Sequence, residues 1–441
     1  AAYLLHGVSG GIMDAAITGR FATRGRQLLQ LTRNPLVRNI AALYGLQLAG
    51  YIVPLITLPL LARALGPEEY GRVSMMHSFA LWATLVVEYG FNMSATREVA
   101  RSRDDPAALG RIVAGVLGAK CALAGVVSLI VLAVVSLPNF RGYPVHVFGA
   151  WLLAVVNGMT PFWYFQGMER MLGASTINVA CRFAGVIGLF ALIRSPRDGW
   201  LVLLIYAAST FLANGINYMQ LYREVRFRLP KGREVLRSLR DGFAMFMVVL
   251  PGNALAVANT FVMGLFAGPV AVAFFAAAER VVRPLVSLMW PVTQALLPHV
   301  SAVARTNKEH ARRVVLASLA YSFGLSCMLA LVLYAAAPAI VDAVFGPGYG
   351  PSVGVLRTLV WLLPVSAVVN AVGYQWLIPM GYERRLSVYY FAAVIGVVGL
   401  AALFVPGWGA LGMAVSAVAA EGLVAAGIVV SALAARAGIK R

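Results

Sequence analysis

Twelve separate stretches of about 20 apolar residues dominate this sequence, and a helix of about 20 residues is long enough to cross the hydrocarbon core of a membrane. The stretches are centred near Gly50, Ala83, Ala124, Val155, Gly185, Ala208, Ala254, Leu288, Leu325, Val368, Val397 and Val424. Hydrophobic residues fill 60% of the 441 positions and charged residues only 12%, which is more apolar than a soluble domain. Because a spanning helix satisfies its own backbone hydrogen bonds, the sequence predicts an all-α integral membrane protein with twelve transmembrane helices.

The basic residues lie mainly in alternate connections between these stretches. If the N-terminus is cytoplasmic, 26 of the 36 lysines and arginines fall on the cytoplasmic side, six on the outer side and four inside the spans. This bias follows the positive-inside rule and predicts that both termini are cytoplasmic. The formal net charge of +19 is therefore assigned to orientation in the lipid bilayer, and no nucleic-acid partner is expected.

The most basic connection divides the chain into two sets of six spans. We expect a cytoplasmic N-terminal tail (1–38), an N-terminal six-helix bundle (39–221), a basic cytoplasmic linker (222–240), a C-terminal six-helix bundle (241–435) and a cytoplasmic C-terminal tail (436–441). The tetrapeptide at Ala154–Asn157 recurs at Ala367–Asn370. Trp163 then corresponds to Trp376 at the same offset. An even number of spans per half preserves orientation, so we expect a parallel pseudo-two-fold repeat with the substrate between the bundles.

Positive charges inside the apolar stretches predict an anion site. Between Ala278 and Pro298, a helix would place Arg280, Arg283, Ser287 and Gln294 within one 60° sector. A charge at the centre of a bilayer costs roughly 2.5–3.5 kcal/mol even on the mildest scale, so this stripe must face other helices or a polar cavity. Guanidinium forks match phosphate oxygens well. The candidate anion-binding residues are Arg280, Arg283, Arg182 and Lys120. Lys120 is close enough to the end of its span that its ammonium group could instead reach the membrane interface.

Two further sets of residues are candidates for roles in such a cavity. Polar and aromatic side chains that could line it and contact sugars are Gln47, Tyr51, Asn157, Trp163, Asn253, Gln294 and Asn370. Hydrogen bonding between helices is the alternative role for each polar member of that set. Carboxylates that could couple transport to an ion are Glu88, Glu279 and Glu421. Glu279 could instead pair with Arg283 at a spacing of four residues.

Several ordered motifs carry a family resemblance. They are LGPEEYG at Leu65–Gly71, EYGFN at Glu88–Asn92 with ATR at Ala95–Arg97, PFWYFQGME at Pro161–Glu169, AAER at Ala277–Arg280 and QALLP at Gln294–Pro298. Together they span the chain from about Asn39 to Arg305. In this order the motifs resemble the Wzx-type O-antigen and oligosaccharide flippases, within the multidrug/oligosaccharidyl-lipid/polysaccharide (MOP) exporter superfamily.

The resemblance implies a function. It implies translocation of undecaprenyl-pyrophosphate-linked oligosaccharides from the inner to the outer leaflet of the bacterial cytoplasmic membrane, for O-antigen, capsule or exopolysaccharide assembly. It further implies alternating access driven by a proton or sodium gradient, without a cofactor. Polysaccharide polymerase and chain-length proteins would be partners.

Other functions remain as alternatives. A multidrug exporter of the same superfamily is one, although an acidic cavity would suit its cationic substrates better than Arg182, Arg280 and Arg283. A membrane glycan polymerase or ligase is another, although the outer loops are short and hold no nucleophile–base pair. A flippase for the peptidoglycan precursor would usually have two more spans. The cysteines Cys121, Cys181 and Cys327 are scattered, and no metal site is expected.

Overall fold

The computed structural model describes residues 35–136 and 140–436, and these residues are helical without strands. The elements are α2 (Pro35–Glu88), α3 (Phe91–Arg101), α4 (Pro106–Val135), α5 (Pro144–Gly158), α6 (Phe162–Gly167), α7 (Met171–Leu192), the short η1 (Pro196–Asp198), α8 (Gly199–Glu224), α9 (Gly232–Val257), α10 (Asn259–Phe266), α11 (Pro269–Ser287), α12 (Trp290–Thr306), α13 (Lys308–Phe345), the short η2 (Pro347–Tyr349), α14 (Ser352–Leu359), α15 (Leu362–Val368), the π-helix η3 (Val369–Leu377) and α16 (Glu383–Arg436). The predicted all-α class is confirmed. Most of the predicted N-terminal tail and the end of the C-terminal tail lie outside the described residues.

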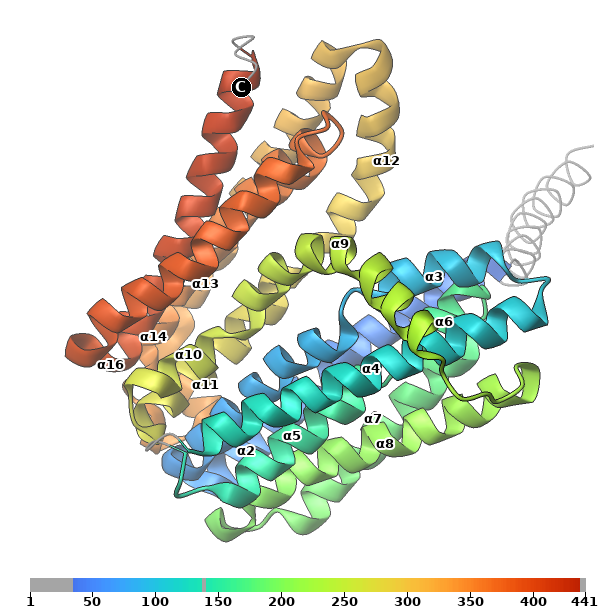
Figure 1. The fold of residues 1–441 in the computed structure, drawn as a ribbon. Coiled ribbons are helices and arrows are strands. Elements are labelled where there is room, and N and C mark those ends of the chain that lie inside the picture. Colours follow the sequence, from blue (N-terminus) through green and yellow to red (C-terminus); the bar gives the residue numbers. More distant parts are fainter. Residues whose placement is uncertain (1–34, 137–139, 437–441) are drawn as a thin grey trace, which may run out of the picture.

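Seven of the described helices are long and apolar enough to cross a membrane, or eight if α9 and α10, which meet at 60°, form one bent span. Helices α2 and α16 each contain 54 residues, about 80 Å at 1.5 Å per residue and far more than a bilayer needs. Each contains a glycine with non-helical backbone, Gly66 (φ 69°) and Gly409 (φ 55°), a conformation that glycine adopts without steric cost. Each is therefore bent into two arms, and the arms of α16 meet at a turn in Figure 1. The count of twelve crossings stays a prediction, as does the internal repeat.

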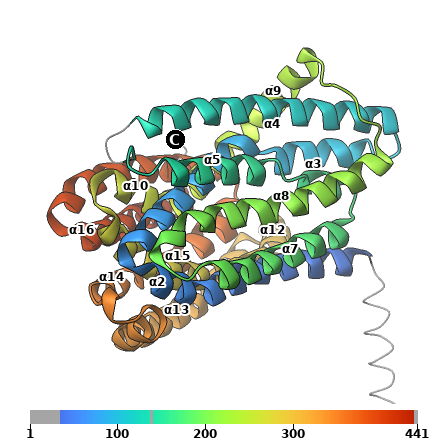
Figure 2. The ribbon, with the colours of Figure 1, turned by 90° about the horizontal axis from the view of Figure 1, so that it is seen from below.

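The helices form two groups that diverge from one end of the molecule (Figure 1). In the first helix group, α2–α8, the long helices α4, α5, α7 and α8 run side by side (Figure 2). The second helix group contains α10–α16. Helix α9 contacts α3 and α4 of the first group and α16 of the second. The segment predicted as a basic linker, 222–240, comprises the end of α8, residues 225–231 and the first turns of α9.

The two helix groups touch closely at the end that the sequence assigns to the outer side. Gly71 of α2 lies so near α11 that a Cβ atom added there would be 1.8 Å from the carbonyl oxygen of Pro269. The rings of Tyr70 and Tyr349 meet edge to face with centroids 6.0 Å apart. Tyr349 also donates a hydrogen bond to the carbonyl oxygen of Ala62 at 3.1 Å. We call Tyr70, Gly71, Pro269 and Tyr349 the outer contact.

Replacing Gly71 by alanine is expected to open the outer contact. The added methyl group would meet backbone atoms of Pro269, which a side-chain rotation cannot move away. A cysteine at Ser74, in a background without native cysteines, should then react severalfold faster with an impermeant thiol reagent added from outside the cell. The matched control is Gly125→Ala, because nothing lies within 4 Å of a Cβ atom added there. Unchanged labelling in the Gly71→Ala protein would show that this contact does not govern access.

Candidate binding cavity between the helix groups

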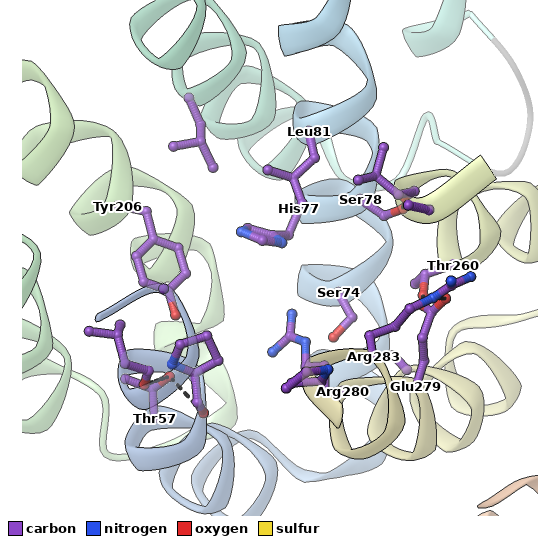
Figure 3. A pocket seen from close by; sticks show the side chains of 18 of the residues that line it. Thr57, Ser74, His77, Ser78, Leu81, Tyr206, Thr260, Glu279, Arg280 and Arg283 are labelled. Atoms are coloured by element: carbon purple, nitrogen blue, oxygen red, sulfur yellow. Dashed lines mark hydrogen bonds and ion pairs between the residues drawn. The ribbon is translucent and has the colours of Figure 1, made fainter. Parts of the chain in front are cut away.

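A cavity of about 640 Å³ lies between the two helix groups. Helices α2, α5, α7 and α8 of the first group line it together with α9, α10 and α11. Both arms of α2 contribute, through residues such as Thr57 and His77 (Figure 3). A volume of this size is typical of sites that enclose a small ligand or part of a larger one.

Helix α11 supplies the cavity's charged wall. Its apolar positions, including Phe275, Ala278 and Val282, are buried against neighbouring helices. Its other face presents Glu279, Arg280, Arg283 and Ser287 to the cavity. The predicted polar stripe is thus present from Arg280 to Ser287, in the second half of α11.

Gln294, the last member of that predicted stripe, does not line the cavity. Helix α11 ends at Ser287, and a new helix, α12, begins at Trp290. The helical register is therefore not continuous between Ser287 and Gln294, and the Gln294 side chain is exposed elsewhere.

Two of the cavity's arginines, Arg182 and Arg280, form no ion pair within the part of the chain that the structure describes. The guanidinium carbon of Arg280 lies 5.3 Å from the centroid of the Tyr70 ring, and its charge acts on His77. Arg182 extends from α7 toward α2, where a Cβ atom added at Gly50 would lie 3.9 Å from Nη1 of Arg182. Among the side chains that the structure describes, no carboxylate forms an ion pair with either guanidinium. Because Arg280 comes from α11 and Arg182 from α7, each helix group supplies one uncompensated positive charge.

Arg283 differs from these two because it is held between two carboxylates. Its Nη1 lies 2.7 Å from Oε1 of Glu421, and its Nε lies 3.4 Å from Oε1 of Glu279. Asn259 and Thr260 donate hydrogen bonds to Glu279 at 3.2 and 2.7 Å. We call Glu279, Arg283 and Glu421 the ion triad; it ties α11 to α16, and its members are only 13–19% exposed. With both carboxylates ionised the triad has no positive charge to offer an anion.

Lys120 and Glu88 lie away from the cavity, near the end of α2. The Lys120 ammonium donates hydrogen bonds to the carbonyl oxygens of Gly158 and Thr160 at 2.6 and 3.2 Å. Gly158 is the last residue of α5 and Thr160 lies two residues beyond it, so the end of the helix leaves these carbonyls without helical partners. Glu88 interacts with the charge of Lys120 and with Asn92. The pair therefore has a structural explanation at a helix end.

The candidate sugar-contacting residues are dispersed. Asn157 lines the cavity, whereas Trp163 is fully buried in a core formed by α3, α4, α6, α7 and α8. Asn370 accepts a hydrogen bond from Thr293 at 3.2 Å and donates one to the carbonyl oxygen of Ser366 at 2.8 Å. Asn253 is exposed outside the cavity lining. Gln47 and Tyr51 have side chains outside those that the structure describes.

Several cavity residues were not among the candidates from the sequence. They are Thr57, Ser74, His77, Ser78, Tyr206, Ser209 and Thr210. The helical spacing puts His77 on the same face as Glu88, but the two are 11 residues, about 16 Å, apart along α2, and only His77 reaches the cavity. Tyr206 stands in an apolar run that gives no periodic signal for the inward face.

The sequence profile of the family described as "Polysaccharide biosynthesis protein" matches residues 36–304, more than half of the chain. The chain belongs to this family. The predicted family resemblance is therefore confirmed. A curated relative from Escherichia coli strain K12, named as a candidate O-antigen transporter, is 28% identical over 374 residues, which are 83% of this chain and 89% of the relative.

Two solved structures share the fold of this polysaccharide biosynthesis family member. The lipid II flippase MurJ in its inward closed conformation has a TM-score of 0.67 at 10% identity, covering 89% of this chain and 87% of MurJ. An inward-facing multidrug resistance MATE family transporter of the MOP superfamily has a TM-score of 0.66 at 17% identity, covering 87% and 95% of the two chains. In both comparisons the similarity extends over both helix groups.

Proposed function

We propose that this chain is a flippase that moves undecaprenyl-pyrophosphate-linked oligosaccharides from the cytoplasmic to the periplasmic leaflet of the bacterial cytoplasmic membrane. The observation that carries the proposal is the pair of uncompensated guanidinium groups, Arg182 and Arg280, in one cavity between the helix groups. Guanidinium groups bind phosphate oxygens through charge-assisted, paired hydrogen bonds. A pyrophosphate contains two phosphate groups, so Arg182 and Arg280 could each bind one. The similarity to a candidate O-antigen transporter supports the same substrate class.

The charge of the cavity argues against a cationic cargo. A positively charged drug would meet two guanidinium groups, and no carboxylate described in the structure forms an ion pair with either. The carboxylate of Glu279, which also lines the cavity, is already paired with Arg283. An anionic headgroup on a lipid therefore suits this cavity better than the cations that multidrug exporters carry.

Alternating access is the transport mode that we propose. The outer contact closes the cavity toward the side assigned to the periplasm, and we take the opposite end as the entrance for substrate. We further propose twelve crossings with both termini cytoplasmic, counting each arm of α2 and of α16 as one crossing. Polysaccharide polymerase and chain-length proteins would receive the product on the outer side.

Reconstitution tests the function directly. Purified protein in vesicles should move a defined undecaprenyl-pyrophosphate-linked oligosaccharide between leaflets, measured by its accessibility to an impermeant glycosidase. Protein-free vesicles give the background rate. A rate equal to this background, with protein shown to be folded and inserted, would exclude the proposed activity.

Cysteine labelling tests the proposed orientation. A cysteine at Gly142, between α4 and α5, should react with an impermeant thiol reagent from outside the cell. A cysteine at Gly232, at the start of α9, should react only after permeabilisation. Both glycines are exposed, and nothing lies within 4 Å of a Cβ atom added at either, so the substitutions should not disturb folding. The reverse pattern would overturn the topology.

Coupling to a proton or sodium gradient is proposed to act through a carboxylate. Glu88, Glu279 and Glu421 remain the candidates, and Glu279 alone among them lines the cavity. We expect Glu279→Gln to preserve exchange of substrate between equal pools and to abolish uphill transport driven by a gradient, because the side chain keeps its shape but loses its charge. Glu88→Gln, an equally isosteric change away from the cavity, should keep gradient-driven transport. If Glu88→Gln loses coupling and Glu279→Gln does not, the coupling site is Glu88 at the end of α2.

A further inference from the structure

Two aromatic rings stand together in the wall of the cavity that also holds Arg280. The ring centroids of His77, on α2, and Tyr206, on α8, are 5.6 Å apart, and the rings are inclined at 58°. Both side chains line the cavity, and both point into the space that Arg280 enters from α11 (Figure 3). Both residues are only partly buried: Tyr206 packs with one side against the hydrophobic core, and both residues remain accessible from the cavity.

The Tyr206 hydroxyl is available to a ligand, and neighbouring positions on α8 carry further hydroxyl groups that line the cavity. Ser209 and Thr210, one turn further along α8, donate hydrogen bonds to the Tyr206 carbonyl oxygen at 2.9 and 3.0 Å. Among the described residues, the phenolic hydroxyl of Tyr206 has no hydrogen-bond partner.

Ser74, on the same arm of α2 as His77, adds a hydroxyl group that has no hydrogen-bond partner among the described residues. The hydroxyl of Ser78 is instead occupied, because it donates to the Val257 carbonyl oxygen and accepts from the Phe261 N–H. Flat rings surrounded by hydroxyl groups match the chemistry of a sugar, which has an apolar C–H face and polar edges.

The position of the two rings relative to the arginine determines which sugar they can reach. In a lipid pyrophosphate that carries a glycan, the first sugar is bonded directly to the phosphate that is further from the lipid. Arg280 enters the space into which both rings point (Figure 3), so a phosphate held by Arg280 would place the next group in the chain beside the rings. A cavity of about 640 Å³ suits this junction rather than a whole oligosaccharide.

We propose that Tyr206 and His77 form a subsite for the sugar attached to the pyrophosphate. The chain then recognises the junction of the first sugar and the pyrophosphate, and the distal sugars lie outside the subsite. This inference rests on the proposed flippase function, and it adds a determinant of specificity that the positive charges do not provide. Tyr206 and His77 contact the cargo but take no part in any bond making or breaking.

Binding of two defined lipids tests the subsite. The probes are undecaprenyl pyrophosphate and the same lipid carrying one N-acetylhexosamine, each titrated against purified full-length protein in nanodiscs. The wild-type protein should bind the glycosylated lipid about five- to tenfold more tightly than the bare lipid. This ratio of affinities corresponds to the free energy of about one aromatic ring contact. Tyr206→Ala and, independently, His77→Leu should bring this ratio close to one while keeping the affinity for the bare lipid. Tyr206→Phe, which retains the ring, should keep most of the preference.

Controls separate the subsite from the proposed function. Phe211→Ala removes a ring from the same helix, but this ring is 69% exposed and outside the cavity, so the ratio should not change. An unchanged preference in both Tyr206→Ala and His77→Leu would overturn the subsite, as would an equal loss of affinity for both lipids. Binding of neither lipid by the wild-type protein would instead overturn the flippase proposal itself.

Discussion

Replacing Arg280 by alanine is expected to abolish translocation while the protein still folds and inserts. Because none of the carboxylates that the structure describes forms an ion pair with Arg280, its removal leaves none of them unpaired. Loss of a charge-assisted contact of about 1.5–3 kcal/mol corresponds to about ten- to hundredfold weaker binding of undecaprenyl pyrophosphate. Arg280→Lys should recover binding only in part, since the ammonium group keeps the charge but not the fork. Titration of the lipid in nanodiscs and transport in vesicles measure the two effects.

The matched control for Arg280 is Arg357→Ala. Arg357 also lies over a tyrosine ring, that of Tyr334, with 5.0 Å between the guanidinium carbon and the ring centroid, but it is outside the cavity. Binding and transport should be unaffected by its removal. Full binding and transport in Arg280→Ala would refute the anion site.

Replacing Arg283 by alanine is expected to have a different effect, a large loss of stability. Removing the arginine leaves the carboxylates of Glu279 and Glu421 buried and close to each other without a counter-charge. Breaking a buried ion pair in this way typically costs about 3–5 kcal/mol. The purified protein should therefore unfold at a clearly lower temperature in detergent. Arg312→Ala, which breaks an exposed pair with Glu309, should change the unfolding temperature little.

A compensated variant distinguishes a structural role from a direct contact with substrate. In Arg283→Leu combined with Glu279→Gln and Glu421→Gln, no buried charge is left unpaired, and most of the lost stability should return. If Arg283→Ala unfolds at the wild-type temperature and only transport is lost, Arg283 acts as a substrate contact instead of a structural centre.

The contrast between Arg280 and Arg283 shows how far the sequence could predict this site. Helical spacing places both arginines on one face of α11, and the structure has them there. The partner that separates their roles, Glu421, is 138 residues further along the chain. No local pattern connects two positions so distant, so only the packing of α16 against α11 reveals that Arg283 is neutralised.

Lys120 gives a second example of the same limit. A lone lysine in an apolar stretch predicts a functional charge, because a buried charge without a role is costly. Its partners in the structure are backbone carbonyls released at the end of α5. The sequence around Lys120 contains no information about where another helix ends. Tyr206 shows the opposite error, a cavity residue that the sequence does not predict. An aromatic residue in an apolar run looks like an ordinary membrane-facing or core residue until its neighbours are known.

The fold was easier to predict than the site, because the length of an apolar stretch and the residues typical of a turn can both be read from a short segment of sequence. The motif at Leu65–Gly71 predicts a turn, and α2 bends there at Gly66. The comparable bend at Gly409 in α16 has a glycine with positive φ as well, but glycine occurs at 43 positions in the chain. Most of them need no special conformation, so a single glycine does not identify a bend.

Repulsion between the two uncompensated arginines also opposes any movement that brings the two helix groups together around an unliganded cavity. Arg182 and Arg280 belong to different helix groups, so any motion that narrows the cavity between these groups brings like charges together. A bound pyrophosphate changes the sign of this interaction, since each cation is then attracted to the same dianion. In the proposed transport cycle, closure of the cavity would thus depend on bound substrate through electrostatics alone. Mobile ions in the lumen weaken repulsion between solvated charges, so the unloaded protein should close more readily as ionic strength rises.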